Sequence, residues 1–154
     1  MDQISKKIKM ISKKLKELKN KFNLNEIDGY VVPKNDEYFS EFAKKDKLKT
    51  ITGFDGSFGI AIILKKKNFL FVDGRYVEQA KIQAGKKFKI LEIPKKLPYQ
   101  VLNSSLNLGF DPMIFTSRSL QYYFRGKIKL TPINKTMINS CLLYTSDAAD
   151  EGSS

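Results

Sequence analysis

The stretch GIAIILKKKNFLFVDG, residues 59–74, holds two nearly unbroken apolar runs on either side of three lysines and an asparagine. Because the polar residues form a turn-like interruption, the stretch predicts a β-hairpin with strands at residues 59–64 and 69–73. Neither run alternates with polar residues, so both strands are expected to be covered on both faces. Strands of that kind are typical of a sheet that has helices on each side.

Outward from the hairpin, the sequence predicts strands and helices in alternation. The apolar residues from Ile4 to Phe22 recur at intervals of three and four, which is typical of one helical face. Residues 27–33 are predicted as a strand ended by Pro33, and residues 35–45 as a short helix capped by Asn35. Further helices are predicted at residues 75–85, 97–106 and 116–126, and further strands at residues 88–94, 108–112 and 127–133. About six strands and about five helices predict an α/β fold: a three-layer domain with a mixed sheet flanked by helices.

The composition is strongly basic, with a formal net charge of +12 at pH 7. Proteins that recognise phosphates usually combine arginine with stacking aromatics on one face, but the only arginines here are Arg75, Arg118 and Arg125. A solvated lysine surface is therefore preferred over a specific nucleic-acid site. No apolar run approaches the roughly 18 residues that span a bilayer, so we expect no membrane contact and a cytoplasmic location. Cys141 is the single cysteine, which leaves no disulfide framework and no metal-ligand spacing.

The composition changes after Asn139. All 28 lysines and arginines precede this point, whereas residues 140–154 carry only the acidic Asp147, Asp150 and Glu151. We predict a domain at residues 1–139 and a non-native, disordered tail at residues 140–154, which resembles translated adapter sequence left at the ends of sequencing fragments. A genuine disordered acidic tail is the alternative.

Ordered motifs carry a resemblance to a known family. They are DGYVVPKNDEYFSEF (residues 28–42), LKTITGFDGSFGIAII (48–63), FLFVDGRYVEQA (69–80) and LGFDPMIFTS (108–117). In order and spacing they resemble the N-terminal domain of aminopeptidase P, or Xaa-Pro aminopeptidase, of the creatinase and prolidase group. The combination of GFDGSFG with DGRY is most similar to the longer, cytosolic-type subfamily.

The resemblance implies that the parent protein is a metal-dependent exopeptidase that removes an N-terminal residue preceding proline. In this family a separate C-terminal domain holds two divalent metal ions, commonly manganese, through carboxylates and a histidine. The present chain contains no histidine. We therefore expect a non-catalytic N-terminal fragment with no catalytic residue, metal ligand or cofactor of its own. Its partners would be the missing catalytic domain, a peptide with proline in second position, and further subunits of a homo-oligomer.

Arg75 is the one candidate substrate-binding residue. The resemblance implies that the arginine of DGRY lies near the peptide in the catalytic cleft, where a guanidinium can hold carbonyls or a carboxylate through two bonds at once. The structural alternative is that Arg75 covers a strand-to-helix corner or pairs with an acidic neighbour such as Glu78, three residues on along the same helix. Asp73 and Gly74 are expected to form the turn that aims it, and Tyr76 is expected to pack.

The remaining candidates favour structural roles. The glycine-rich residues 51–59 precede a strand instead of opening a helix, so they are predicted as a loop with positive φ angles and close backbone approaches, not as a phosphate cradle. Asp55 is expected to cap this loop, and Ser57 has no histidine to activate it. Tyr122, Tyr123 and Phe124 are expected to occupy core and rim positions.

Two other functions stay open: a free-standing binding or pseudo-enzyme module that retains only this domain, and a basic nucleic-acid-associated protein. Reading the gene past codon 139 for a metal-ligand domain or an early stop separates the module from the enzyme. Retention on a polyanion column at moderate salt tests for a nucleic-acid-associated protein, because nonspecific attraction to phosphates falls steeply with salt.

Overall fold

The predicted hairpin is present in the computed structural model, which describes residues 3–34 and 47–133. Strand β2 (Ile60–Leu64) pairs antiparallel with β3 (Asn68–Asp73), and Leu64 N donates to Lys67 O at 2.8 Å to close the turn. Both strands are buried along almost their whole length. The expectation of strands covered on both faces is thus confirmed.

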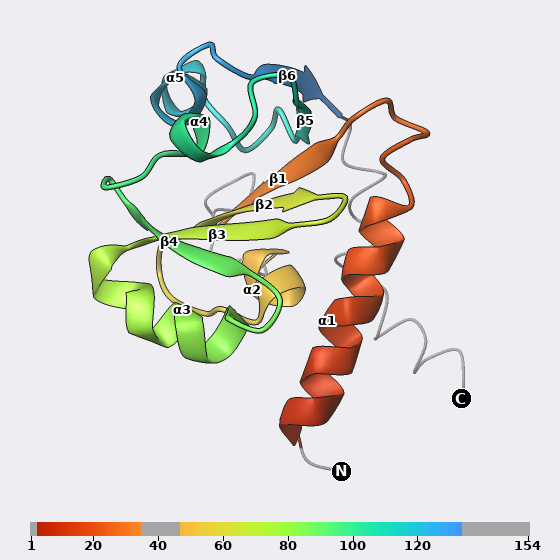
Figure 1. The fold of residues 1–154 in the computed structure, drawn as a ribbon, viewed down its shortest axis with the longest axis vertical. Coiled ribbons are helices and arrows are strands. Elements are labelled where there is room, and N and C mark those ends of the chain that lie inside the picture. Colours follow the sequence, from red (N-terminus) through yellow and green to blue (C-terminus); the bar gives the residue numbers. More distant parts are fainter. Residues whose placement is uncertain (1–2, 35–46, 134–154) are drawn as a thin grey trace.

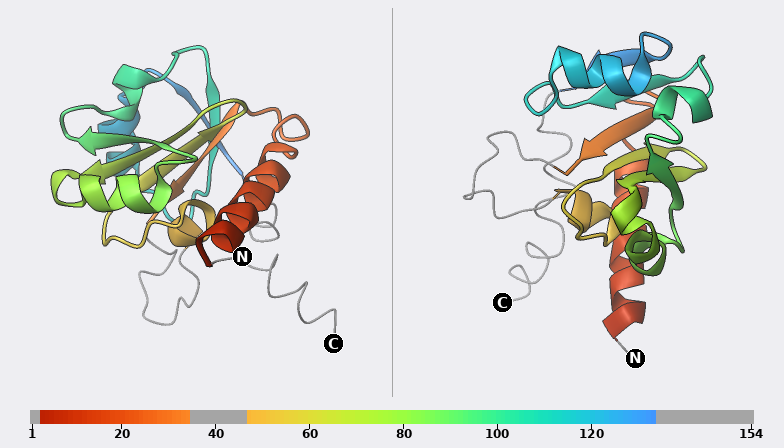
Figure 2. Two further views of the ribbon diagram at one scale, coloured as in Figure 1. Left: turned by 60° about the horizontal axis from the view of Figure 1, so that its bottom comes forward. Right: turned by 90° about the vertical axis from the view of Figure 1, so that its left-hand side faces the viewer.

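The hairpin lies within a six-stranded mixed sheet of order β4-β3-β2-β1-β5-β6. The other strands are β1 (Gly29–Pro33), β4 (Lys89–Ile93), β5 (Asn107–Phe110) and β6 (Lys129–Pro132). Strand β1 is antiparallel to β2 and parallel to β5, while β3–β4 and β5–β6 are parallel pairs. The antiparallel centre β3-β2-β1 is therefore extended in parallel by one strand, β4, on one side and by two strands, β5 and β6, on the other (Figures 1 and 2).

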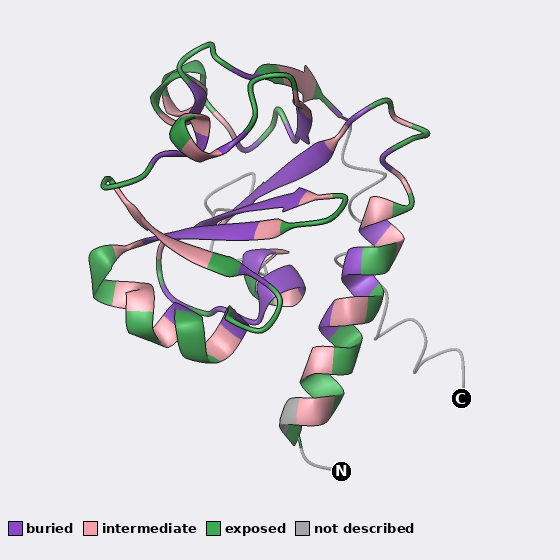
Figure 3. Cartoon of the chain, viewed as in Figure 1, coloured by how far each residue is buried: buried purple, intermediate pink, exposed green. Residues whose placement is uncertain are grey.

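Helices cover both faces of this sheet (Figure 1). Against one face pack α1 (Gln3–Lys19), α2 (Lys47–Thr52) and α3 (Val77–Ala84), and against the other pack α4 (Pro98–Val101) and α5 (Ser117–Phe124). Side chains of the central strands alternate between the two cores, with Tyr30, Val32, Ala61, Ile63, Leu70 and Val72 in one and Val31, Ile60, Ile62, Phe69 and Phe71 in the other. The three-layer α/β architecture is confirmed, and Figure 3 shows the continuous burial of these strands.

Helix α1 follows the predicted apolar spacing. Ile11, Leu15 and Leu18 are buried against the sheet, and Phe22 is fully buried in the turns that follow Lys19. Full burial of such side chains contributes roughly 1.5–3 kcal/mol each, which accounts for a helix whose other faces are mostly lysine. The N-terminal turns project beyond the sheet (Figures 1 and 2).

Some predicted boundaries differ from the observed ones. Helix α4 begins with Pro98 at its first position, as expected, but ends at Val101 because Leu102 is extended. Helix α5 is capped by Thr116, whose side chain accepts from Ser119 N. The predicted helix at residues 35–45 lies outside the described residues, whereas the short helix α2 was not predicted. None of the helices within residues 3–34 and 47–133 is long and apolar enough to cross a bilayer.

Candidate functional site

The candidate site is the corner where β3 ends and α3 begins. The backbone makes one 3-10 turn, η1 (Gly74–Tyr76), before α3 starts at Val77. Asp73 has extended backbone angles and its Oδ1 accepts from Arg75 N at 2.8 Å, so its side chain caps the turn. An aspartate that binds the backbone two residues on is a common device for reversing the chain. Asp73 and Gly74 thus form the turn, as the sequence predicts.

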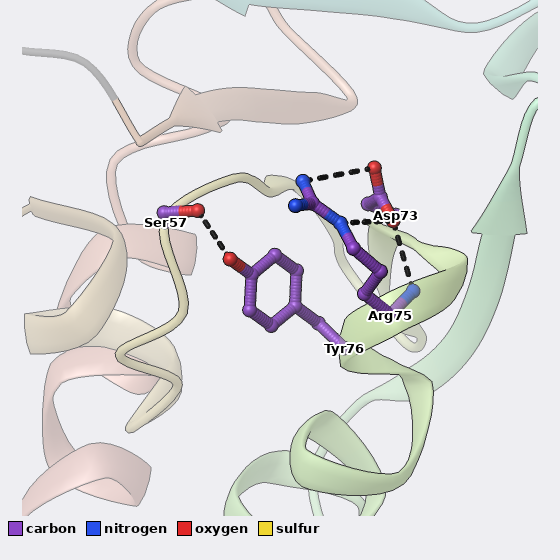
Figure 4. Close-up of polar contacts among 4 residues, drawn as sticks. All are labelled: Ser57, Asp73, Arg75 and Tyr76. Carbon is purple, nitrogen blue, oxygen red and sulfur yellow. Dashed lines mark hydrogen bonds and ion pairs between the residues drawn. The ribbon is translucent and has the colours of Figure 1, made fainter.

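The guanidinium of Arg75 turns back onto the same aspartate (Figure 4). Arg75 Nε donates to Asp73 Oδ1 at 3.1 Å, a terminal nitrogen donates to Oδ2 at 3.4 Å, and the Arg75 side chain remains 72% exposed. Its Cζ also lies 5.2 Å from the ring centroid of Tyr76, a cation–π distance. Arg75 therefore lies at the surface, held by Asp73 and Tyr76.

The suggested alternative partner, Glu78, pairs with Lys81 at 3.7 Å instead. The three-residue helical spacing does not apply to Arg75, because this residue lies in η1 and precedes α3. The expectation of an acidic neighbour holds, but the neighbour is Asp73, which the backbone N–H already fixes in place.

The electrostatics of this pair keep both groups charged. The backbone N–H of Arg75, followed by its guanidinium, lowers the pKa of the Asp73 carboxyl below its usual value. The hydrogen bond to Asp73, followed by its negative charge, raises the pKa of Arg75. The corner therefore presents a permanently cationic fork beside an ionised carboxylate.

Tyr76 packs, as predicted. Its ring meets the fully buried ring of Phe54 edge-to-face, with centroids 6.1 Å apart and an interplanar angle of 75°. Its hydroxyl hydrogen-bonds to Ser57 Oγ (Figure 4). Ser57 thus meets a tyrosine and not a base, and a nucleophilic role has no structural support.

The glycine-rich loop is attached to α3 through Asp55. Its Oδ1 accepts from Gln79 Nε2 at 2.7 Å and from Gln83 Nε2 at 3.0 Å, while Asp55 N donates to Gln83 Oε1 at 3.2 Å. The hydrogen bond from Gln83 is the main cause that lowers the pKa of this carboxyl. Asp55 is therefore a tether between the loop and α3, a structural role that differs from the predicted cap of the loop itself, because its carboxylate accepts from side chains of the helix.

The glycines of the loop serve two different purposes. Gly53 has a φ of +85°, a conformation that L side chains rarely adopt. At Gly56, whose φ is not positive, an added Cβ would overlap Cζ of Phe54, and at Gly59 it would lie 2.9 Å from Leu48 Cδ2. The prediction of positive φ is thus correct for Gly53 and wrong for Gly56 and Gly59, which allow close packing instead.

On the opposite side of the sheet, the three aromatics of α5 take graded positions. Phe124 is fully buried, Tyr123 packs half-buried against the same core, and Tyr122 is 42% exposed. Burial raises the pKa of Tyr123 to about 12. These are the core and rim positions that the sequence predicts.

A metal pair does not fit the donor set of the described part of the chain. Within residues 3–34 and 47–133 no three histidine, cysteine, aspartate or glutamate side chains come together as metal ligands. Asp55 and Asp73 are each engaged with nitrogen donors of their own surroundings. What the corner offers is charge and hydrogen bonding, which suit recognition of a polar partner.

The architecture is that of the creatinase N-terminal domain: a six-stranded mixed sheet between two helical layers. Residues 14–138 match the family described as the Creatinase/Prolidase N-terminal domain, and the chain belongs to this family.

Relatives in sequence are Xaa-Pro aminopeptidases matched over their N-terminal part. The chain is 30% identical over 141 residues to a probable Xaa-Pro aminopeptidase P of Coprinopsis cinerea, covering 83% of this chain and 23% of the relative. It is 40% identical over 115 residues to a probable Xaa-Pro aminopeptidase P of Laccaria bicolor, covering 69% and 18%. The chain therefore spans less than a quarter of the length of these relatives.

Solved structures share the fold at lower identity. The X-prolyl aminopeptidase of Caenorhabditis elegans, described as a cytosolic enzyme with a di-nuclear active site, superposes with a TM-score of 0.71 at 21% identity, over 88% of this chain and 26% of that one. The N-terminal domain of the cytoplasmic peptidase PepQ of Mycobacterium tuberculosis superposes with a TM-score of 0.65 at 20% identity, over 83% and 97%. The second comparison matches this chain to a domain whose structure was solved alone.

Proposed function

We propose that this chain is the non-catalytic N-terminal domain of a Xaa-Pro aminopeptidase, and that it contributes Arg75 to the peptide-binding cleft of the longer enzyme. The observation that carries the proposal is the placement of Arg75. Its guanidinium is a cationic fork at the exposed end of β3, on a turn whose backbone is fixed by Asp73. The names of the sequence relatives supply the substrate class.

The longer enzyme would remove the N-terminal residue from a peptide whose second residue is proline. Two divalent metal ions of the manganese type, held by the C-terminal part, would supply a bridging water and polarise the scissile carbonyl. No side chain of the described residues is assigned to that chemistry, because their donor set does not fit it. This domain would instead shape the mouth of the cleft and the interface of a cytoplasmic homo-oligomer.

Arg75 is suited to bind a peptide in two respects. Its ion pair with Asp73 is exposed, and exposed ion pairs are weak, so a peptide carbonyl or carboxylate can replace or join Asp73. In addition, its bonds to the described residues use Nε and one terminal nitrogen, which leaves donors for a ligand. The cation–π contact with Tyr76 limits the directions in which the fork can point.

The test is Arg75→Ala in the longer enzyme, assayed on a peptide with proline in second position. A lost hydrogen bond from a charged donor is worth about 1.5–3 kcal/mol, so we expect kcat/KM to fall by about 10- to 100-fold. Arg75→Lys keeps the charge without the fork and should recover part of the loss. Arg118→Ala removes an exposed arginine on α5, at the other face of the sheet, and should leave kcat/KM unchanged.

Unchanged kinetics for Arg75→Ala, with the domain still folded, would return Arg75 to a structural role. The non-catalytic assignment has a separate test: the 154-residue chain, supplied with manganese, should not cleave the same peptide. Cleavage by the chain alone would contradict it. A gene that continues past codon 139 into a metal-ligand domain would support the enzyme over a free-standing module.

A further inference from the structure

An open cleft of about 460 Å³ lies beside the β2–β3 turn, away from the Arg75 corner. Lys66 and Lys67 come from the β2–β3 turn, Lys87 from the turn between α3 and β4, and Lys89 from the first position of β4. Residues 66–67 and 87–89 meet because β3 and β4 are parallel neighbours, with Phe69 in register with Lys89. The fold thus brings four lysines from two separate turns to one cleft.

These lysines are exposed and lack acidic partners among the described residues. The ion pairs within residues 3–34 and 47–133 involve other cations, such as Lys81 with Glu78 and Lys95 with Glu92. No carboxylate lines the cleft. The positive charge of these four lysines is therefore not offset by a carboxylate in the lining of the cleft.

The surroundings hold the two turns in place. Asn68 Nδ2 donates to Lys87 O at 3.0 Å, which joins the beginning of β3 to the turn before β4. Lys65 Nζ donates to Asn23 Oδ1 at 2.9 Å, which joins the β2–β3 turn to the segment after α1. The lysine side chains thus extend from a fixed backbone, so less conformational entropy of the two turns is lost when a ligand binds.

The lining of the cleft combines positive charge with apolar side chains. Phe69 and Val101 form an apolar wall, and a low-dielectric wall beside charges of one sign focuses their field. At the end of α1, burial first and then the positive charge of Lys87 lower the pKa of Lys19, so Lys87 lies close enough to act on this neighbouring lysine. Four cations in this volume call for a ligand that carries several negative charges in a small space.

We propose that this cleft binds an oligophosphate group, in which three or more negative charges lie within a few ångströms of one another. Lysine binds phosphate as a point charge, and no arginine lines the cleft, so the site would attract its ligand by charge and not through paired bidentate bonds. The volume lies in the usual range for small-molecule sites. The two sources of this chemistry are a free inorganic oligophosphate and a nucleoside triphosphate.

The experiment titrates the 154-residue chain with inorganic tripolyphosphate by calorimetry at low ionic strength. Lys67→Glu with Lys89→Glu reverses two charges in the cleft, and Lys9→Glu with Lys13→Glu reverses two exposed charges on α1. Both double variants have the same net charge, and circular dichroism verifies their fold. We expect one-to-one binding that weakens at least about tenfold in the cleft variant and less than about twofold in the α1 variant.

Equal weakening in both variants, or binding of many ligands per chain, would show attraction by net charge alone and overturn the proposal. A parallel titration with ATP identifies the source: tighter binding of ATP assigns the site to a nucleotide, and equal binding assigns it to the phosphates alone. Binding of a single-stranded oligonucleotide that tripolyphosphate does not displace would also overturn the proposal, because it would indicate a nucleic-acid surface in place of a compact site.

Discussion

Replacement of Gly56 by alanine tests the packing of the loop directly. The added Cβ would overlap Cζ of Phe54, and this ring is fully buried beneath the loop and in contact with Tyr76. The ring cannot swing into solvent without opening the core beside α2 and α3. Overpacking of this kind costs about 1–3 kcal/mol, a large part of the roughly 5–15 kcal/mol that stabilises a typical domain.

The assay is urea unfolding of four chains: the wild type, Gly56→Ala, Phe54→Leu and the double variant. Phe54→Leu removes the atom that the new methyl group meets, and destabilises the protein on its own by leaving space in the core. If the ring is the obstacle, Gly56→Ala should cost less in the Phe54→Leu background. We expect a coupling energy of about 0.5–2 kcal/mol between the two positions.

Gly126→Ala serves as the control in the same cycle. Gly126 has a φ of +68° and a Cβ added there would meet no atom within 4 Å, so alanine should cost about 1 kcal/mol through backbone strain alone. That cost should be the same with phenylalanine or leucine at position 54. Additive effects of Gly56→Ala and Phe54→Leu would refute the steric explanation of Gly56.

Three further predictions follow from individual contacts. Thr116→Ala removes the side-chain cap of α5 and should lower the free energy of unfolding by about 1 kcal/mol, while Thr116→Ser should retain most of it, as measured by urea unfolding. Tyr123 has a pKa raised to about 12 in the folded protein, so the stability it contributes is present below pH 10 and is lost as the pH rises from about 10 towards 12. Tyr123→Phe should therefore reduce the loss of unfolding free energy at alkaline pH. An unchanged dependence of the unfolding free energy on pH would mean that Tyr123 titrates like a free phenol. Arg75→Ala should raise the pKa of Asp73 only part of the way to its ordinary value in an NMR titration, because the backbone N–H of residue 75 still donates to it; a full return would show that the guanidinium, not the backbone, is the main cause.

The sequence predicts the sheet well because burial on two faces leaves a distinct pattern. The runs 60–64 and 69–72 are apolar at every position, since alternate side chains enter opposite cores. Helix α1 is equally clear, because its apolar spacing persists over several turns. Short elements leave much weaker patterns. Helix α2 has six residues, too few for a period of 3.6 to repeat, and was missed for that reason.

The candidate site is predicted less completely. The family resemblance singles out Arg75, while helical spacing suggests Glu78 as its partner, because the 3-10 turn before α3 cannot be distinguished in the sequence from the helix itself. The lysine cleft is also beyond a local pattern: Lys67 and Lys89 are brought together only by the parallel pairing of β3 with β4. In the sequence these lysines are part of a general basic background.

The position of β1 has a consequence for the order in which the domain assembles. Its antiparallel neighbour β2 forms a hairpin with β3 that can close locally, whereas the pairing of Gly29 with Leu108 joins distant parts of the chain. Closing a long loop costs more chain entropy than closing a hairpin, so β5 and β6 are expected to dock after β1, β2 and β3 have formed. Core truncations in the hairpin should therefore mainly slow refolding, and truncations in β5 should mainly accelerate unfolding.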